Sequence, residues 1–177
     1  MIDASLDMEL VRRVVATIDN LPRRKLALRL MPVKPVPGPF RTAGKGEKLS
    51  IDPDNAERYA THVQLAKSID SGKLVSVYVR FYPLFQQAYE DLGYPGAYFN
   101  DRLVEVIDHL LAAPELPPQA TLVPPKVYYK FADPDLEGAS AGHKILMRIG
   151  NENAAVLKTK LREIRAELTR KSPDPRP

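Results

Sequence analysis

Side chains suited to binding a ligand are concentrated between Tyr78 and Leu111. Tyrosine hydroxyls, amides, a guanidinium, carboxylates and a histidine all occur in this short stretch. We predict that they line a polar groove, with the following binding residues: Arg80, Tyr82, Gln86, Tyr89, Asn100, Asp101 and His109. The competing interpretation is structural, in which these groups cap helices and satisfy one another's hydrogen bonds.

Aromatic residues run through the same stretch at three- and four-residue steps: Tyr78, Phe81, Tyr82, Phe85 and Tyr89. A stripe of this kind is more often helix core than a ligand platform. Buried tyrosine hydroxyls need hydrogen-bond partners, so some of these rings should reach a polar cleft or the surface.

Catalysis has weaker support than binding. Paired carboxylates of a hydrolase that cleaves polymers such as glycans would have to come from Glu90, Asp91, Asp101 and Glu105. Two carboxyl groups facing each other across a cleft, roughly 5–10 Å apart, would favour that enzyme. A serine hydrolase would need Ser140 or Ser76 beside His109, and neither serine lies in a nucleophile-elbow motif. We therefore predict no catalytic residues and favour a non-catalytic binding module.

Metal and cofactor sites are not expected. Cysteine is absent, and His62, His109 and His143 belong to different predicted elements. A zinc site needs three or four converging ligands, of which one helix supplies at most two. The Gly44-Lys45 dipeptide lacks the spacing of a phosphate-binding loop.

The composition is that of one globular domain. The chain has 177 residues, of which 44% are hydrophobic, and a net charge of +4. Basic residues cluster in the last predicted helix, but Glu163 and Glu167 interrupt them, so nucleic acid is not an expected partner. We expect a soluble chain without a signal peptide, because Met1-Ile2-Asp3 has neither a basic start nor an apolar stretch.

These side chains should be positioned by helices. Apolar residues at helical spacing predict an all-α domain over residues 1–171, a compact bundle of about six helices followed by a disordered tail at 172–177. Expected N-caps are Asp7, Asp52, Asn100 and Asn151. Pro83 should kink or split the third helix near Tyr82. The predicted helices cover residues 7–20, 52–69, 74–92, 100–111, 133–149 and 151–168.

Prolines and glycines predict the non-helical parts. Four prolines between Met31 and Phe40 favour an extended strap across the bundle, or alternatively a ligand for a proline-reading domain. At most one small β-hairpin is expected, around Ala43–Glu47, and a loose loop is the alternative there. The stretch Leu122–Phe131 looks extended, although its prolines disfavour a central strand. Gly138 and Gly142 frame Ser140 as a notch for close packing.

Several longer phrases resemble one family. They include the run from Arg80 to Gly93, the run from Tyr98 to Arg102, Val106 to Leu111, Pro125 to Tyr129, Phe131 to Pro134, Ser140 to Lys144 and Gly150 to Asn153. Together they resemble the bacterial DUF3014 family of unknown function, over most of the chain as far as about Leu168.

The resemblance implies a cell-envelope or periplasmic location. Members of that family typically carry an N-terminal membrane helix and a proline-rich linker ahead of this domain, and neither is seen in this sequence. The family offers no established catalytic residues. The expected partner is then a protein, a peptide, an envelope component or a second copy of the chain, and the hydrolase alternative would act on envelope polymers.

Overall fold

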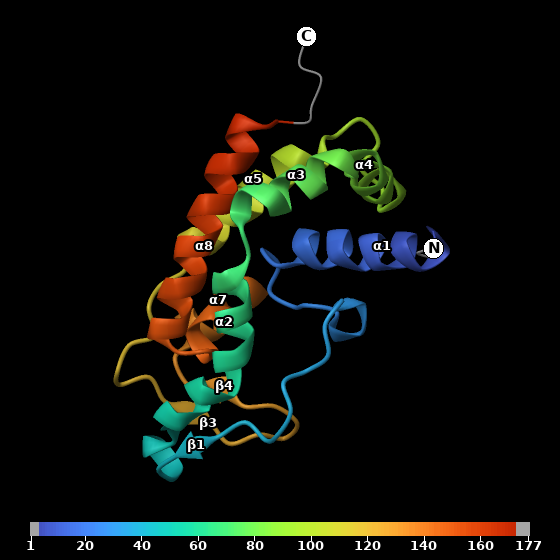
Figure 1. Ribbon diagram of the computed structural model, residues 1–177. Helices are drawn as coiled ribbons and strands as arrows, with labels where there is room; N and C mark the ends of the chain where they lie inside the picture. Colours follow the sequence, from blue (N-terminus) through green and yellow to red (C-terminus); the bar gives the residue numbers. More distant parts are fainter. Residues whose placement is uncertain (1–3, 173–177) are drawn as a thin grey trace.

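The computed structural model describes residues 4–172, and for residues 4–7 and 28 it describes the backbone alone. The described residues form eight α-helices with short 3₁₀ turns and two small strand pairs, which confirms the all-α prediction (Figure 1). The predicted tail lies outside the described residues from residue 173 onward. In chain order the α-helices are α1 (Ala4–Asn20), α2 (Ala60–Ser68), α3 (Ser71–Arg80), α4 (Tyr82–Asp91), α5 (Phe99–Leu111), α6 (Pro134–Gly138), α7 (Ala141–Arg148) and α8 (Asn151–Arg170).

The long C-terminal helix α8 is the element on which most of the others assemble. Helices α2, α3, α5 and α7 pack along it, as Figure 1 shows for the red helix and its neighbours. Its predicted apolar seam faces inward: Leu168 is buried between Val75 of α3 and Ile107 of α5. Helix α1 packs on α4 and α5 instead, and in Figure 1 it crosses below α3 and α4.

The predicted break at Pro83 is confirmed. Helix α3 ends at Arg80 and α4 begins at Tyr82, with Pro83 in the first turn of α4. Proline is tolerated there because the first backbone N–H groups of a helix have no partner within the helix. The break turns α4 away from the line of α3, toward α1.

Other predicted helices are also divided. The stretch from 52 to 69 is a 3₁₀ helix, η3 (Pro53–Tyr59), followed by α2, and Asp52 caps η3 as predicted by accepting from the N–H of Asp54. The stretch from 133 to 149 is divided between α6 and α7. Ser140 causes that division, because its Oγ accepts the N–H of His143 and starts a new helix.

Three predicted caps are wrong. Helix α1 begins at Ala4, so Asp7 lies inside it, and α5 begins at Phe99, so Asn100 is also an internal residue. Asn151 is the first residue of α8 rather than its cap. Its amide instead bonds the backbone N–H and C=O of Leu116. A side chain engaged by a distant segment is not free to cap its own helix.

The proline-rich segment is the predicted strap. It follows a 3₁₀ turn, η1 (Leu28–Leu30), and runs from α1 toward η3. Its backbone is tied at both ends: Arg13 Nη2 donates to the Met31 carbonyl over 2.9 Å, and Arg58 Nη2 donates to the Gly38 carbonyl over 2.7 Å. These bonds satisfy carbonyls that a polyproline segment cannot pair internally.

Two short antiparallel strand pairs lie at the end of the molecule away from α4. The predicted hairpin pairs β1 (Thr42–Ala43) with β2 (Ser50–Ile51), around a 3₁₀ turn, η2 (Gly46–Lys48). The extended stretch after α5 pairs β3 (Leu122–Val123) with β4 (Lys130–Phe131). Both pairs are two residues long, and Pro124, which directly follows β3, lacks a backbone donor that could extend the second pair.

Candidate functional site

Gln86 is the centre of the predicted polar site, and all its polar atoms are engaged. Its Oε1 accepts from the hydroxyl of Tyr82 over 2.9 Å and from the backbone N–H of Phe99 over 2.8 Å. Its Nε2 donates to the Ala97 carbonyl and to Glu90. The N-cap position of α5 makes no side-chain cap bond of its own, so Gln86 caps that helix from α4.

Tyr89 and Asn100 are buried in the core between the same two helices. The Tyr89 ring stacks on Tyr94 with centroids 4.6 Å apart and also contacts Phe99. Burial raises the pKa of the Tyr89 hydroxyl, and the negative charge of Asp19 raises it further. Asn100 accepts a long hydrogen bond from Tyr78. These residues are well placed to hold α4 against α5.

The remaining predicted residues lie elsewhere. Arg80 is exposed at the end of α3, with its guanidinium 5.6 Å from the centroid of the Phe81 ring. Asp101 is exposed in the first turn of α5. His109 lies at the other end of α5, against α7. The structure thus brings together Tyr82, Gln86, Tyr89 and Asn100, and separates Arg80 and His109 from them.

His109 and Ser140 do form the contact that a hydrolase would need. The His109 Nε2 lies 2.8 Å from the Ser140 Oγ, and the His109 ring stacks on His143 at 4.1 Å. Burial lowers the pKa of His109, and His143 lowers it further, so Nε2 of a neutral ring can accept the serine proton.

The groups around His109 and Ser140 are used to hold helices together. Ser140 is only 8% exposed and already caps α7. The nearby backbone N–H groups of Ala141 and Gly142 donate to the carbonyls of Arg23 and Leu21. Neither of these two donors is left to stabilise an oxyanion. Gly142 is the predicted packing notch, since a Cβ there would collide with Leu110.

A buried carboxylate that the sequence did not single out joins α1 to α5. Asp19 is 3% exposed and accepts from Arg102 Nε over 2.9 Å and from Arg23 Nη2 over 2.8 Å. Tyr94 also donates to it, and Arg102 reaches on to Glu105. Asp19 and Arg102 are 83 residues apart, and no local motif links them.

A wholly apolar cleft opens between α1 and the face formed by α3, α5 and α8. Its volume is about 340 Å³, and none of the described side chains that line it presents a polar atom to it. Helix α1 supplies one wall, and Phe85 and Phe99 are among the other lining residues. The lining also includes Val14, Ile18, Leu21, Leu74, Leu110, Leu161 and Ile164.

A second apolar cavity of about 300 Å³ adjoins the cleft. The linings of the two share Leu21, Leu110, Leu161 and Ile164, so the two cavities are neighbours. The lining of the second cavity also includes Ala66 of α2 and the side chain of Lys160 of α8, whose Nζ is bonded to Ile69, Ser71 and Glu163. We refer to the two cavities together as the apolar channel.

Most of the chain, including nearly all the residues that line the channel, matches the model of one protein family. The model of the family described as "Protein of unknown function (DUF3014)" matches residues 10–165. The chain belongs to the DUF3014 family. No curated protein and no solved structure matches the chain. All the channel residues except Leu168 lie inside the matched DUF3014 region.

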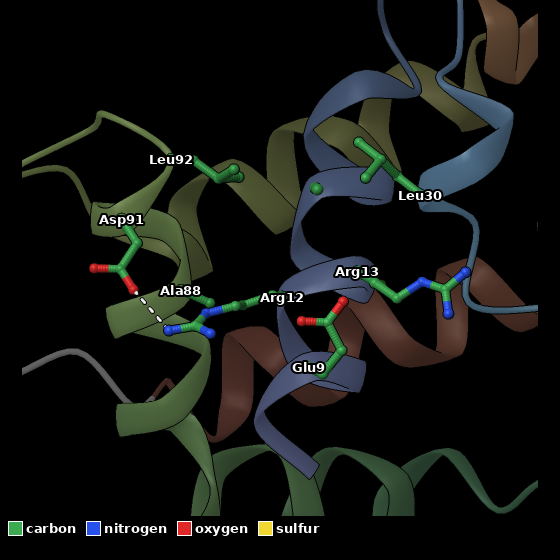
Figure 2. A pocket seen from close by; sticks show the side chains of 8 residues that line it. Glu9, Arg12, Arg13, Leu30, Ala88, Asp91 and Leu92 are labelled. Carbon is green, nitrogen blue, oxygen red and sulfur yellow. Dashed lines mark ion pairs between the residues drawn. The ribbon is translucent and has the colours of Figure 1, made fainter. Parts of the chain in front are cut away.

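A mixed-charge pocket of about 350 Å³ lies on the opposite side of α1 in this DUF3014 chain, against α4. Figure 2 shows Arg12 reaching across to Asp91, while Arg13 points away toward the strap. Glu9 and Asp91 line the same pocket, so two carboxylates do share one recess. Both are exposed, and Asp91 lies 3.6 Å from Arg12. Neither carboxyl is therefore buried as a proton-donating acid requires.

Residues 4–172 were also compared with the requirements of a metal site, a membrane-spanning helix and a basic nucleic-acid-binding face. The side chains described within that range include no group of three His, Asp or Glu placed to hold a metal ion. None of its helices combines the length and the apolar character needed to cross a membrane. Acidic residues of α8 pair with two of its cations: Glu163 with Lys160, and Glu167 with Arg170.

Sequence reasoning missed the channel although the residues that line it are prominent in the sequence. Helical spacing assigns Val14 and Ile18 to the core, and it does the same for Leu74, Leu161 and Ile164. Periodicity identifies an apolar face, but it cannot say whether another helix fills the space opposite that face. The sequence therefore offers no signal for the cleft beyond the apolar faces of α1, α3, α5 and α8 that line it.

Proposed function

We propose that this domain is a non-catalytic binding module that takes an apolar ligand into the cleft between α1 and the α3–α5–α8 face. The observation that carries the proposal is the cleft itself, about 340 Å³ with wholly apolar walls. It exceeds twice the volume of the apolar cavity, about 150 Å³, that is known to stay dry and bind benzene. Ligand pockets in proteins fall in the same size range.

Filling the cleft is favourable for a physical reason. Walls of Leu, Ile, Val and Phe make no hydrogen bonds with water, and an empty apolar space forfeits dispersion contacts. A ligand that covers those walls gains roughly 25 cal/mol for each Å² of apolar surface removed from water. No bond within the protein has to break, because the described walls of the cleft present no polar group to be displaced.

This proposal moves the binding surface from the predicted polar groove to the apolar cleft beside it. Gln86, Tyr82 and Asn100 are already committed to hydrogen bonds within the domain. Arg80 is a predicted binding residue that stands exposed, and it remains testable on its own. We expect Arg80→Ala to leave apolar binding unchanged.

The hydrolase alternative gains no such support. Glu90 is bonded by Gln86, Asp91 by Arg12, and Glu105 by Arg102. A glycosidase needs one carboxyl kept protonated by burial while its partner stays ionised. Those three carboxylates lie on the exposed surface.

The envelope location stays part of the proposal and rests on the family resemblance alone. A binding module of this kind would meet apolar ligands or partners at a membrane surface. Fractionation of the native cells, followed by detection of the chain, tests the location. Recovery of the chain with the cytosolic fraction would contradict the envelope location, but it would not bear on the proposal that the cleft binds a ligand.

Titration with an apolar fluorescent dye tests the binding site. We expect 1-anilinonaphthalene-8-sulfonate to bind the folded protein in a saturable way. Leu74 lines the cleft and is 41% exposed, whereas Val77 on the same helix is 56% exposed and does not line it. Leu74→Gln should weaken dye binding about tenfold or more, by the loss of roughly 1.5–3 kcal/mol of apolar contact.

Val77→Gln is the matched control, because it adds the same polar group to the same helix outside the cleft. Equal loss in both variants would mean that the dye binds the outer face of α3. No saturable binding by the wild-type protein would refute the proposed function. Near-ultraviolet circular dichroism should confirm that each variant keeps its tertiary packing.

A further inference from the structure

The strand pair β3–β4 has one buried face and one exposed face. Leu122 pairs with Phe131, and both side chains are buried, whereas the next pair, Val123 and Lys130, is exposed. This alternation follows from the strand geometry, in which successive side chains point to opposite faces. The backbone N–H of Leu122 also donates to the Leu49 carbonyl over 2.7 Å. The pair is thus anchored to the domain on one side and open to solvent on the other.

The loop that joins these two strands is exposed and largely apolar. All of its residues from 124 to 128 are exposed, and they read Pro-Pro-Lys-Val-Tyr. Val127 is 76% exposed and Tyr128 is 71% exposed. Single exposed apolar side chains are ordinary on protein surfaces, but here they are consecutive and adjoin the exposed Val123. The two prolines fix their own φ angles, which restricts the loop from folding back over these side chains.

Lysines flank the apolar tip of the loop. Lys126 lies within it and Lys130 begins β4, and both are exposed. The sequence has no acidic residue between Leu122 and Phe131. The loop itself is therefore cationic. The segments beside it carry exposed charges of both signs: Lys45, Glu47, Lys48, Asp133 and Asp135.

This combination matches the surface of a lipid bilayer that contains anionic lipids. The negative headgroups of such a surface attract lysines, and the apolar region just beneath them accepts a valine side chain. Tyrosine suits the boundary between the two, because its ring is apolar and its hydroxyl is polar. A protein partner would need a pocket shaped for the projecting tip, whereas a fluid bilayer adapts to it.

We propose that the β3–β4 loop is a peripheral contact between this domain and an anionic lipid surface. Val127 and Tyr128 enter the headgroup region, while Lys126 and Lys130 pair with lipid phosphates. The contact is weak and reversible, because two apolar side chains bury far less surface than a lipid anchor does. It goes beyond the proposed function, since it uses a different surface and does not depend on a ligand in the cleft.

A tryptophan reporter tests where the lipid is contacted. The chain contains no tryptophan, so Tyr128→Trp introduces a single one at the tip of the loop. Vesicles of phosphatidylglycerol and phosphatidylcholine in equal parts should shift its emission to shorter wavelengths, and lipids brominated on their acyl chains should quench it. Tyr98→Trp is the matched control, because Tyr98 is 46% exposed at the start of α5. Its emission should stay unchanged.

Vesicle sedimentation measures how much each side chain contributes. Val127→Gln should weaken binding about tenfold, which corresponds to roughly 1.5 kcal/mol for burial of a valine side chain. Val77→Gln makes the same substitution at an exposed valine of α3 and should have no effect. Lys126→Gln should weaken binding about fivefold, which corresponds to about 1 kcal/mol for one lysine near a negative surface. Lys73→Gln, at an exposed lysine of α3, is the control for charge.

The lipid composition tests the role of charge. Vesicles of phosphatidylcholine alone should bind more than about tenfold more weakly, because both lysines lose their attraction to the surface. Added salt should weaken binding to the anionic vesicles. Equal binding to both kinds of vesicle would contradict the assigned role of the lysines. Sedimentation of the Tyr128→Trp variant without a change in its emission would show that another surface binds, and would overturn the proposal.

The outcomes also separate this inference from other partners and from the proposed function. Absence of binding to either kind of vesicle refutes the lipid contact. If polyglutamate shifts the emission of Tyr128→Trp and vesicles do not, the loop recognises an acidic protein and the lipid contact is wrong. Saturable dye binding through Leu74 without vesicle binding would leave the cleft proposal standing alone. Vesicle binding without dye binding would leave only the loop.

Discussion

Asp19 ties the C-terminal end of α1 to α5 and to the turn that precedes α5. Its carboxylate lies in the core and receives hydrogen bonds from Arg102, Arg23 and Tyr94, which belong to three different segments. Buried charges are tolerated only when paired and hydrogen-bonded. Removal of the carboxylate would leave the guanidinium of Arg102 facing a neutral group in a largely covered position.

We therefore expect Asp19→Asn to lower the free energy of unfolding by about 3–5 kcal/mol, the cost of breaking a buried ion pair. Urea unfolding followed by circular dichroism measures the change. Asp91→Asn is the control, because its pair with Arg12 is half exposed and such pairs contribute about 1 kcal/mol or less. Equal losses would show that the Asp19 network does not hold α1.

His109 should make stability depend on pH. Burial lowers its pKa in the folded protein below the ordinary value, and His143, Arg102 and Glu105 are the charged or titratable groups acting on it. The neutral ring is thus favoured by folding. The contribution of His109 to the free energy of unfolding is fully present above its pKa in the unfolded chain, about 6.5. It is lost as the pH falls through its pKa in the folded protein.

Unfolding free energies at pH 7.5 and 5.0 should show this loss, and His109→Gln should reduce it. Glutamine can still accept from Ser140, but it cannot be protonated in this range. His62→Gln is the control, since His62 is exposed on α2. If the free energy of unfolding of His109→Gln depends on pH as that of the wild type does, His109 is not the cause of the pH dependence.

At the scale of elements, the junction of α4 and α5 depends on one amide. Gln86 accepts a hydrogen bond from the backbone N–H of Phe99, the first residue of α5. The N-cap residue Tyr98 makes no side-chain cap bond to this helix. The same amide also bonds Tyr82 and the Ala97 carbonyl. The polar groups that suggested a ligand site therefore build the turn between two helices.

Gln86→Ala should lower the free energy of unfolding by about 1–3 kcal/mol, because it leaves a backbone donor without a partner. Gln87→Ala removes an exposed neighbour of the same type and should cost under about 0.5 kcal/mol. Thermal unfolding monitored by circular dichroism compares the two variants. A neutral Gln86→Ala would mean that water caps α5 as well as Gln86 does.

At the scale of the whole molecule, α1 is attached at its sides and leaves the channel open along one face. The strap holds it through Arg13, the ion pairs hold it through Asp19, and α4 covers Val15. None of these attachments brings α1 onto α8. The channel is thus a consequence of how α1 is tethered, and its described walls come from α1, α2, α3, α4, α5, α7 and α8.

The parts that the sequence determined by itself are those governed by local physics. Pro83 ends one helix and starts the next because it lacks a backbone donor, and it does so in any surroundings. The seam of α8 faces inward because its apolar residues recur at the helical period. These effects act over a few residues, which is why the all-α class and the strap could be predicted.

Tertiary structure alone decided the use of the polar and apolar surfaces. Asn100 and Asn151 look like caps, but distant partners engage them. Asp19 finds Arg102 only because α1 crosses α5, and Leu74 faces an open cleft only because no helix fills it. A side chain's local pattern shows which face it lies on. What covers that face depends on long-range packing, which the period of the sequence does not encode.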